Sequence, residues 1–159
     1  MVVVIIAVLT TLAVLSIGVL GADHGLDAEG DRYTDVVKAA SEQAGLESRD
    51  YGIWFGPAGY AVLVYVERRG RWEALPEDRL YAWHALATGV GTALELEGRP
   101  AALGLESPAT PRVPQVLLYS SGESSPYRLE LSRAGSELKW VVEGRPDGTL
   151  LVTRPGTAP

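Results

Sequence analysis

His24 and His84 are the only imidazoles that the chain offers for acid–base or metal chemistry. His24 follows a long apolar stretch and His84 sits beside Trp83 among apolar residues, so we interpret both as structural. The sequence has no cysteine, which excludes disulfides, thiolate zinc sites and cysteine nucleophiles. It also lacks a glycine-rich phosphate loop, an HExxH motif and a GxSxG motif. We therefore predict a non-enzymatic protein with no catalytic residue, no cofactor and no metal.

The acidic residues are scattered, and no pair has the arrangement of a glycosidase site. Glu123 lies among serines, whose hydroxyls can order a loop by capping backbone amides, but one acid supplies too few oxygens for calcium. Asp147 reads as a turn residue. Twenty acidic against fourteen basic residues give a net charge of −6, which disfavours a nucleic-acid partner. The basic pair Arg68 and Arg69 is too small to change this.

The first 22 residues carry no charged side chain. As a helix they would span roughly 33 Å, about the thickness of a bilayer's hydrocarbon core. A cleaved signal peptide would have a basic start and a shorter apolar stretch, and a chain this short can hardly bury an all-apolar helix. We interpret residues 1–22 as a transmembrane helix. Acidic residues precede the first basic one, Arg32, so we expect the larger part of the chain to lie outside the cytoplasm.

Residues 23–46 are expected to continue this helix in amphipathic form. Apolar positions recur every three or four residues, with charged residues between them. Gly45 is a plausible terminator, and Gly25 and Gly30 would soften the helix enough to permit a bend. The apolar stripe expected to pack along the domain consists of Leu26, Tyr33, Val37, Ala40 and Ala44.

After Gly45 the hydrophobic period changes from 3.6 to 2, which favours strands. Gly56–Gly59 is a hairpin turn, residues 101–113 a loop or linker, and residues 80–84 either a strand or a short helix. Seven or eight short strands indicate an α+β fold: a long helix followed by a domain of two antiparallel sheets over residues 47–155, with a flexible tail at 156–159. We expect strands at 51–55, 60–67, 71–75, 92–97, 114–120, 127–133, 138–143 and 149–153.

Two stretches of the sequence are distinctive. The uncharged start, Met-Val-Val-Val-Ile-Ile, is similar to the membrane helix of type IV pilin-like proteins but begins a few residues after the usual start of that helix. Residues 117–129, LLYSSGESSPYRL, together with 50–52, 59–60 and Trp72, resemble the GspH/FimT pilin-like family of minor pseudopilins, whose stretch reads SSGE-x-SPF-x-L. The residues that carry this family motif are Ser120, Ser121, Gly122, Glu123, Pro126 and Tyr127.

The resemblance implies a minor pseudopilin: a structural subunit of the type II secretion pseudopilus that helps export folded proteins across the outer membrane. It would be a single-pass inner-membrane protein with its C-terminal domain in the periplasm, and later part of the periplasmic pseudopilus. Implied partners are the major pseudopilin, the tip minor pseudopilins, the inner-membrane assembly platform and a prepilin peptidase, with methylation of the processed chain. Helices in such a fibre would pack through Val8, Leu12, Leu15 and Val19.

One departure from the family pattern concerns the start of the chain. The family begins with a basic leader ending in Gly, then a Phe and a nearby Glu, and none of these precedes or interrupts residues 1–22. We expect that the start codon is placed too late, so no cleavage site can be assigned. A type IV pilus minor pilin, a membrane-tethered periplasmic binding module and an anchored periplasmic enzyme remain as alternatives.

Overall fold

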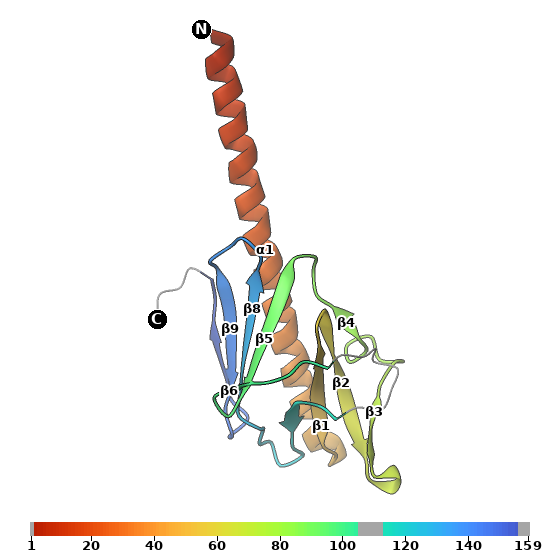
Figure 1. Ribbon diagram of the computed structural model, residues 1–159. Coiled ribbons are helices and arrows are strands. Elements are labelled where there is room, and N and C mark those ends of the chain that lie inside the picture. The colour runs from red at the N-terminus through yellow and green to blue at the C-terminus, as the bar shows by residue number, and fades with distance from the viewer. Residues whose placement is uncertain (1, 105–112, 156–159) are drawn as a thin grey trace.

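A single long helix dominates the shape of the molecule. The computed structural model describes residues 2–104 and 113–155, with side chains from residue 25 onward. Helix α1 runs without interruption over Val2–Glu47, and its N-terminal half extends beyond the strands, whereas its second half lies along them (Figure 1). The 3-10 turn η1 (Glu67–Arg69) is the other helical segment in the described part of the chain.

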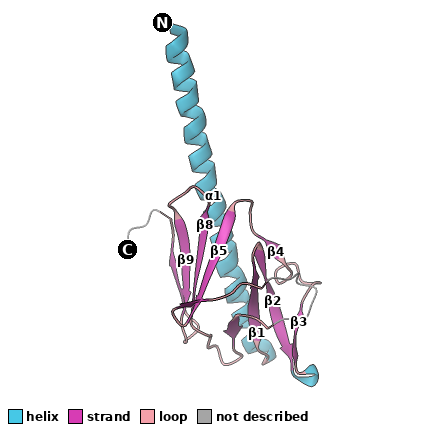
Figure 2. Ribbon diagram, viewed as in Figure 1, coloured by secondary structure: helices cyan, strands magenta, loops and turns pink. Residues whose placement is uncertain are grey.

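The remaining elements form two sheets in which every pair of strands is antiparallel, one on either side of the helix (Figure 2). The first sheet has the order β3-β2-β1-β7, with β4 pairing to β2. Its strands are β1 (Tyr51–Gly56), β2 (Gly59–Val66), β3 (Arg71–Ala74), β4 (His84–Ala85) and β7 (Val116–Leu118).

The second sheet has the order β10-β9-β8-β5-β6. The predicted α+β class, with a long N-terminal helix and two antiparallel sheets, is confirmed. The strands of this sheet are β5 (Val90–Leu96), β6 (Arg99–Pro100), β8 (Tyr127–Arg133), β9 (Lys139–Gly144) and β10 (Leu150–Thr153).

The second half of α1 is part of the hydrophobic core. It contacts β8 and β9 of one sheet and β1 and β7 of the other, so the helix joins the two sheets. The sheets meet it with side chains such as Ile53, Leu129 and Trp140, all of which are fully buried. Burying large apolar side chains in this way stabilises the fold by about 1.5–3 kcal/mol each.

Gly30 marks the closest approach of the helix to a sheet. A Cβ at this position would overlap the Trp140 indole of β9, so only glycine leaves room for the ring. The helix continues through Gly25 and Gly30 without a break, and the bend that these glycines would permit stays a prediction. At Gly30 the glycine lets an aromatic ring pack against the backbone.

Two other expectations on secondary structure were wrong. The helix does not stop at Gly45 but at Glu47, where Ser48 takes up the left-handed conformation (φ 52°) that ends a helix without a glycine. Residues 80–84 form neither a helix nor a regular strand. Asp78 caps a turn there, accepting hydrogen bonds from the amides of Leu80 and Ala82, and only His84–Ala85 pair with β2.

The close packing at Gly30 gives a first prediction. The substitution Gly30→Ala should destabilise the domain by about 1–3 kcal/mol, because the added methyl group displaces Trp140 from a filled core. The measurement is urea unfolding of residues 25–159, followed by tryptophan fluorescence.

The matched control is Gly45→Ala on the same helix. Gly45 is exposed, and the nearest atom to an added Cβ is the Ser120 carbonyl oxygen at 4.0 Å. This variant should be neutral or stabilised by up to about 1 kcal/mol, since alanine favours the helix. Equal effects of the two substitutions would contradict the packing described for Gly30.

Candidate functional site

The loop between β7 and β8 contains the distinctive SSGESSPY stretch, and it extends the β7 edge as a small hairpin. Leu118 bridges Ser124, and the Leu117 amide donates to the Ser125 Oγ at 2.9 Å while its carbonyl accepts from the Ser125 amide at 3.0 Å. The tip closes at Gly122, whose φ of 92° suits glycine. Serine hydroxyls therefore order this loop.

This loop is clamped to the turn between β9 and β10. The Ser124 hydroxyl donates to the Arg145 carbonyl at 2.7 Å, and the Ser124 amide donates to the Pro146 carbonyl at 3.1 Å. At Gly148 a side chain would collide with the Gly122 carbonyl, so the two loops touch through their backbones. Ser124 is 7% exposed, and both of its polar groups are paired. The two loops therefore form one rigid unit.

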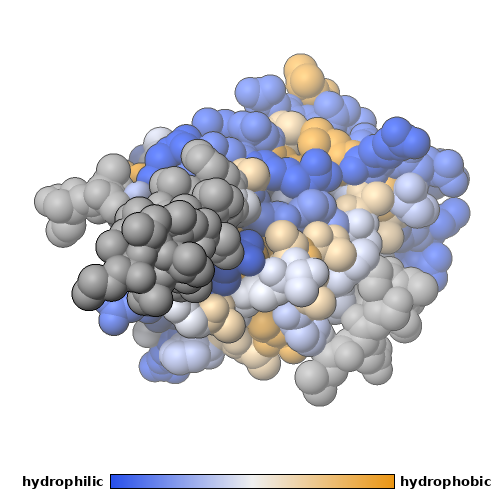
Figure 3. All heavy atoms as spheres, turned by 90° about the horizontal axis from the view of Figure 1, so that it is seen from above, coloured by the Kyte–Doolittle hydropathy of each residue, from blue (hydrophilic) through white to orange (hydrophobic). Residues whose placement is uncertain are grey.

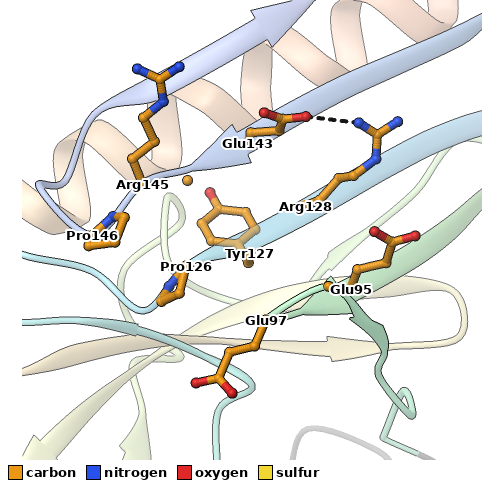
Figure 4. A pocket seen from close by; sticks show the side chains of 10 residues that line it. Glu95, Glu97, Pro126, Tyr127, Arg128, Glu143, Arg145 and Pro146 are labelled. Carbon is orange, nitrogen blue, oxygen red and sulfur yellow. Dashed lines mark hydrogen bonds and ion pairs between the residues drawn. The ribbon is translucent and has the colours of Figure 1, made fainter.

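A pocket of about 300 Å³ opens beside this unit, at the end of the second sheet (Figure 4). On one side of it Pro126 precedes β8 and Tyr127 begins the strand, and on the other side Arg145 and Pro146 follow β9. The β5–β6 turn contributes Glu97 and Gly98. This is a concave surface built from three chain segments that are distant in sequence.

A buried tyrosine pair connects the same unit to the helix. The Tyr33 hydroxyl of α1 donates to the Tyr127 hydroxyl at 3.0 Å, and both side chains are almost fully buried. Burial raises the pKa of both phenols above the ordinary tyrosine value, because it disfavours the charged phenolate. The pair therefore stays neutral and holds the start of β8 against the helix.

Comparison with known proteins identifies this architecture, although no family model matches the chain. Type II secretion system protein H of Pseudomonas aeruginosa is 37% identical to it over 143 residues, which cover 86% of this chain and 80% of the relative. The chain belongs to the type II secretion system protein H family. The protein of the same name from Aeromonas hydrophila is 24% identical over 145 residues, covering 86% of this chain and 78% of that relative.

Solved structures of minor pseudopilins have the same fold. The crystal structure of the minor pseudopilin EpsH from the type II secretion system of Vibrio cholerae aligns with a TM-score of 0.72 and 21% identity, covering 87% of this chain and 99% of that one. The solution structure of Escherichia coli GspH aligns with a TM-score of 0.65 and 20% identity, covering 87% of this chain and 94% of that one. The predicted membership of the GspH family is thereby confirmed.

The structure places the predicted residues of this protein H family member in two regions. The helix stripe lies in the core: Leu26, Tyr33, Val37, Ala40 and Ala44 are each at most 2% exposed. In the motif, Ser120–Glu123 and Pro126 are exposed at the loop surface, whereas Tyr127 is buried. The structure therefore separates the motif into an exposed loop and a buried anchor.

The predicted assembly residues Val8, Leu12, Leu15 and Val19, and the predicted transmembrane segment 1–22, lie outside the residues whose side chains are described. Among the described residues, no helix is long and apolar enough to cross a membrane. Most of the predicted 101–113 loop also lies outside, since residues 105–112 are not described. These assignments stay predictions.

One polar contact that sequence reasoning missed joins α1 to the segment before β5. Glu29 accepts from the Ala87 amide at 3.0 Å and lies 2.7 Å from the Nε2 atom of His84. His84 therefore connects β4 to the helix. No local signal predicts this pairing, because the partners are more than 50 residues apart. In the described part of the chain, no cluster of histidine and acidic side chains could hold a metal ion.

The tyrosine pair gives a second prediction. Either single substitution, Tyr33→Phe or Tyr127→Phe, should destabilise the domain by about 1–3 kcal/mol, because it leaves the other hydroxyl buried without a partner. The double variant should cost clearly less than the sum of the two, since both polar groups are then removed together. Urea unfolding of the four proteins in a double-mutant cycle measures the difference; strictly additive effects would contradict a direct interaction.

The stability of the double variant should also depend on pH differently from that of the unmodified chain. An unfolded tyrosine ionises near pH 10, and burial raises the pKa of Tyr33 and Tyr127 in the folded state. The contribution of the two tyrosines to the free energy of unfolding is therefore complete below about pH 10. It is lost at higher pH, because the unfolded chain then releases protons that the folded chain retains. The double phenylalanine variant should lose less stability than the unmodified chain between about pH 9 and pH 11.

Proposed function

We propose that this chain is a minor pseudopilin: a non-enzymatic structural subunit of the type II secretion pseudopilus that helps export folded proteins across the outer membrane. Membership of the protein H family supports this role, and so does the fold shared with minor pseudopilins. The observation that carries the proposal is the single helix α1, which runs unbroken from an uncharged N-terminal segment into the β-domain. A fibre assembled through that segment would connect to each domain by one continuous helix.

The N-terminal segment acts as the anchor in this proposal. Residues 1–22 would span the inner membrane once, residues 23–46 would continue the helix amphipathically, and the β-rich domain at 47–155 would face the periplasm, followed by the tail at 156–159. The face of the domain from which the helix emerges fits a position in water beside the membrane. Seen from above in Figure 3, hydrophilic residues occupy much of it and hydrophobic ones form small separate patches, as expected of a surface in contact with water.

The apolar N-terminal helix would have two roles in assembly, first in the membrane and then in the fibre. In the membrane, helices without charged groups associate by close packing, for which Val8, Leu12, Leu15 and Val19 are the candidates. On extraction into the fibre, that surface would leave the lipid and become buried between subunits. The partners would be the major pseudopilin, the tip minor pseudopilins and the inner-membrane assembly platform, after processing by a prepilin peptidase if a leader lies upstream.

The anchor gives a third prediction. The double substitution Leu12→Glu and Leu15→Glu should prevent membrane insertion or assembly of the full chain, because each charge costs about 2.5–3.5 kcal/mol at the centre of a membrane helix. The measurement is the fraction of the chain that stays in the membrane after carbonate extraction, together with secretion of an exported protein by the producing cells.

Two added charges at exposed positions of the same helix provide the control. Ala28 and Leu46 are both exposed, so Ala28→Glu with Leu46→Glu should leave insertion and secretion unchanged. Normal insertion and normal secretion by the Leu12/Leu15 variant would overturn the proposed function.

A further inference from the structure

The turn between β9 and β10 contains the one Asp-Gly pair of the sequence, Asp147-Gly148. In such a pair the backbone nitrogen of glycine can attack the aspartate side chain, because glycine has no side chain to hinder the approach. The product is a cyclic imide, and its hydrolysis yields isoaspartate, in which the main chain runs through the aspartate side chain. Asp147 is exposed, so water reaches it freely. The sequence therefore marks this turn as a candidate for spontaneous rearrangement.

The rearrangement needs no reagent other than water. The Gly148 nitrogen forms a bond to the Asp147 Cγ atom while the bond from Cγ to its hydroxyl breaks, and the hydroxyl leaves with the amide proton as water. Water then adds to the main-chain carbonyl carbon of Asp147 and breaks the bond from that carbon to the Gly148 nitrogen. The first step requires the nitrogen and Cγ to reach an attack geometry. It also favours a neutral carboxyl, because a carboxylate has no hydroxyl to release.

The hydrogen bonds of the folded turn oppose both requirements. The Gly148 amide donates to the Arg145 carbonyl at 2.9 Å, so the attacking nitrogen is held in the turn. The Asp147 Oδ1 atom accepts from the Thr149 hydroxyl at 2.6 Å and from the Thr149 amide at 3.0 Å, which fixes the carboxylate in one orientation. These bonds, the hydroxyl's first, lower the pKa of Asp147 and keep its side chain ionised.

The surroundings of the turn leave its backbone little freedom to close the imide ring. The Arg145 amide donates to the Thr149 carbonyl at 2.9 Å, which closes the turn on its other side. Gly148 has a φ of 79° and lies directly against the Gly122 carbonyl of the SSGESSPY loop. Ring formation rotates the main chain between Asp147 and Gly148, so it requires the turn to open first.

We propose that Asp147-Gly148 is an isoaspartate-forming site that the folded turn keeps unreacted, with the Thr149 hydroxyl as the side-chain group that protects it. Rearrangement then takes place in molecules whose turn has opened locally. The inference does not depend on the proposed function. It assigns a modification site to the chain and a protective role to a threonine outside the core.

The modification would act on the loop clamped to this turn. Isoaspartate adds one carbon atom to the main chain at position 147 and moves the carboxylate away from Thr149. The carbonyls of Arg145 and Pro146, which accept from the Ser124 hydroxyl and amide, lie immediately before this position. The rearranged chain would therefore lose the clamp that orders the SSGESSPY loop.

The test compares rates of rearrangement in the full-length chain, purified in detergent and incubated at neutral pH either folded or in guanidinium chloride. The variants are Thr149→Ala and the conservative Thr149→Ser. The matched control is Thr153→Ala, which removes a hydroxyl from an exposed position on the neighbouring strand β10. Isoaspartate at position 147 is quantified by peptide mass spectrometry with electron-transfer fragmentation, which distinguishes it from aspartate.

We expect the folded unmodified chain to rearrange at least roughly tenfold more slowly than the denatured chain, because several hydrogen bonds must break first. Folded Thr149→Ala should react about two- to tenfold faster than the unmodified chain, the range that loss of one hydrogen bond permits. Thr149→Ser and Thr153→Ala should react as the unmodified chain does, and all four chains should react equally in denaturant. Equal rates in the folded and denatured unmodified chain, or no gain for Thr149→Ala over Thr153→Ala, would overturn the inference.

The variant Gly30→Ala separates local protection from general stability. It loosens the core at Trp140, near the other end of β9, and leaves every hydrogen bond of the turn in place. Its folded form should rearrange at the rate of the unmodified chain. A gain as large as that of Thr149→Ala would contradict the role assigned to the threonine hydroxyl.

The effect on the clamp is measured on the isoaspartate form after its separation by ion-exchange chromatography. A glutamate-specific protease should cleave after Glu123, in the released loop, at least roughly fivefold faster than in the unmodified chain, because cleavage requires local opening. Cleavage after Glu137, which is exposed on the β8–β9 connection, should be unchanged. Equal cleavage after Glu123 in the two forms would overturn the link between this site and the loop.

Discussion

The whole molecule depends on the burial of one face of α1 against two sheets at once. The helix supplies the surface on which the sheets meet, and Gly30 lets the Trp140 ring pack directly against its backbone. A β-domain of this size without that helix would expose the inner faces of both sheets. The helix that would enter the membrane is therefore also a core element of the domain, and one continuous helix joins its N-terminal half to the two sheets.

Hydrogen bonds also fix the surface loop of the candidate site. The SSGESSPY loop would be a flexible connection if its amides faced water, but Ser124 and Ser125 pair them with neighbouring strands and with the β9–β10 turn. The hydrogen bond between the Tyr33 and Tyr127 hydroxyls then connects the end of this loop to the core. The Tyr127 hydroxyl is paired with that of a second tyrosine on the helix. The same contacts hold Tyr127, Arg145 and Pro146, which line the pocket beside the loop.

Much of this architecture is predictable from local patterns, and the remainder depends on contacts between distant residues. The spacing of Leu26, Tyr33 and Ala44 indicates a buried helix stripe, and aromatic and β-branched residues on either side of the Gly56–Gly59 turn predict the first hairpin, because both signals arise within a few residues. The fit of Gly30 to Trp140 and the contact of Glu29 with His84 join residues far apart in sequence, so no local pattern contains them. Residues 80–84 looked like a strand or helix because they are apolar, yet the Asp78 cap makes them a turn. The pocket emerges only from folding, since its walls come from three separate segments.

The dependence of the domain on the helix is tested most directly by comparing two fragments of the chain. Residues 25–159 contain the buried helix face, whereas residues 48–159 contain every strand but no part of α1. The amide proton NMR spectrum and urea unfolding of each fragment are recorded under the same conditions. We predict dispersed resonances and one cooperative transition for residues 25–159, and neither for residues 48–159. A dispersed spectrum and an equally stable transition for residues 48–159 would contradict the central role of the helix.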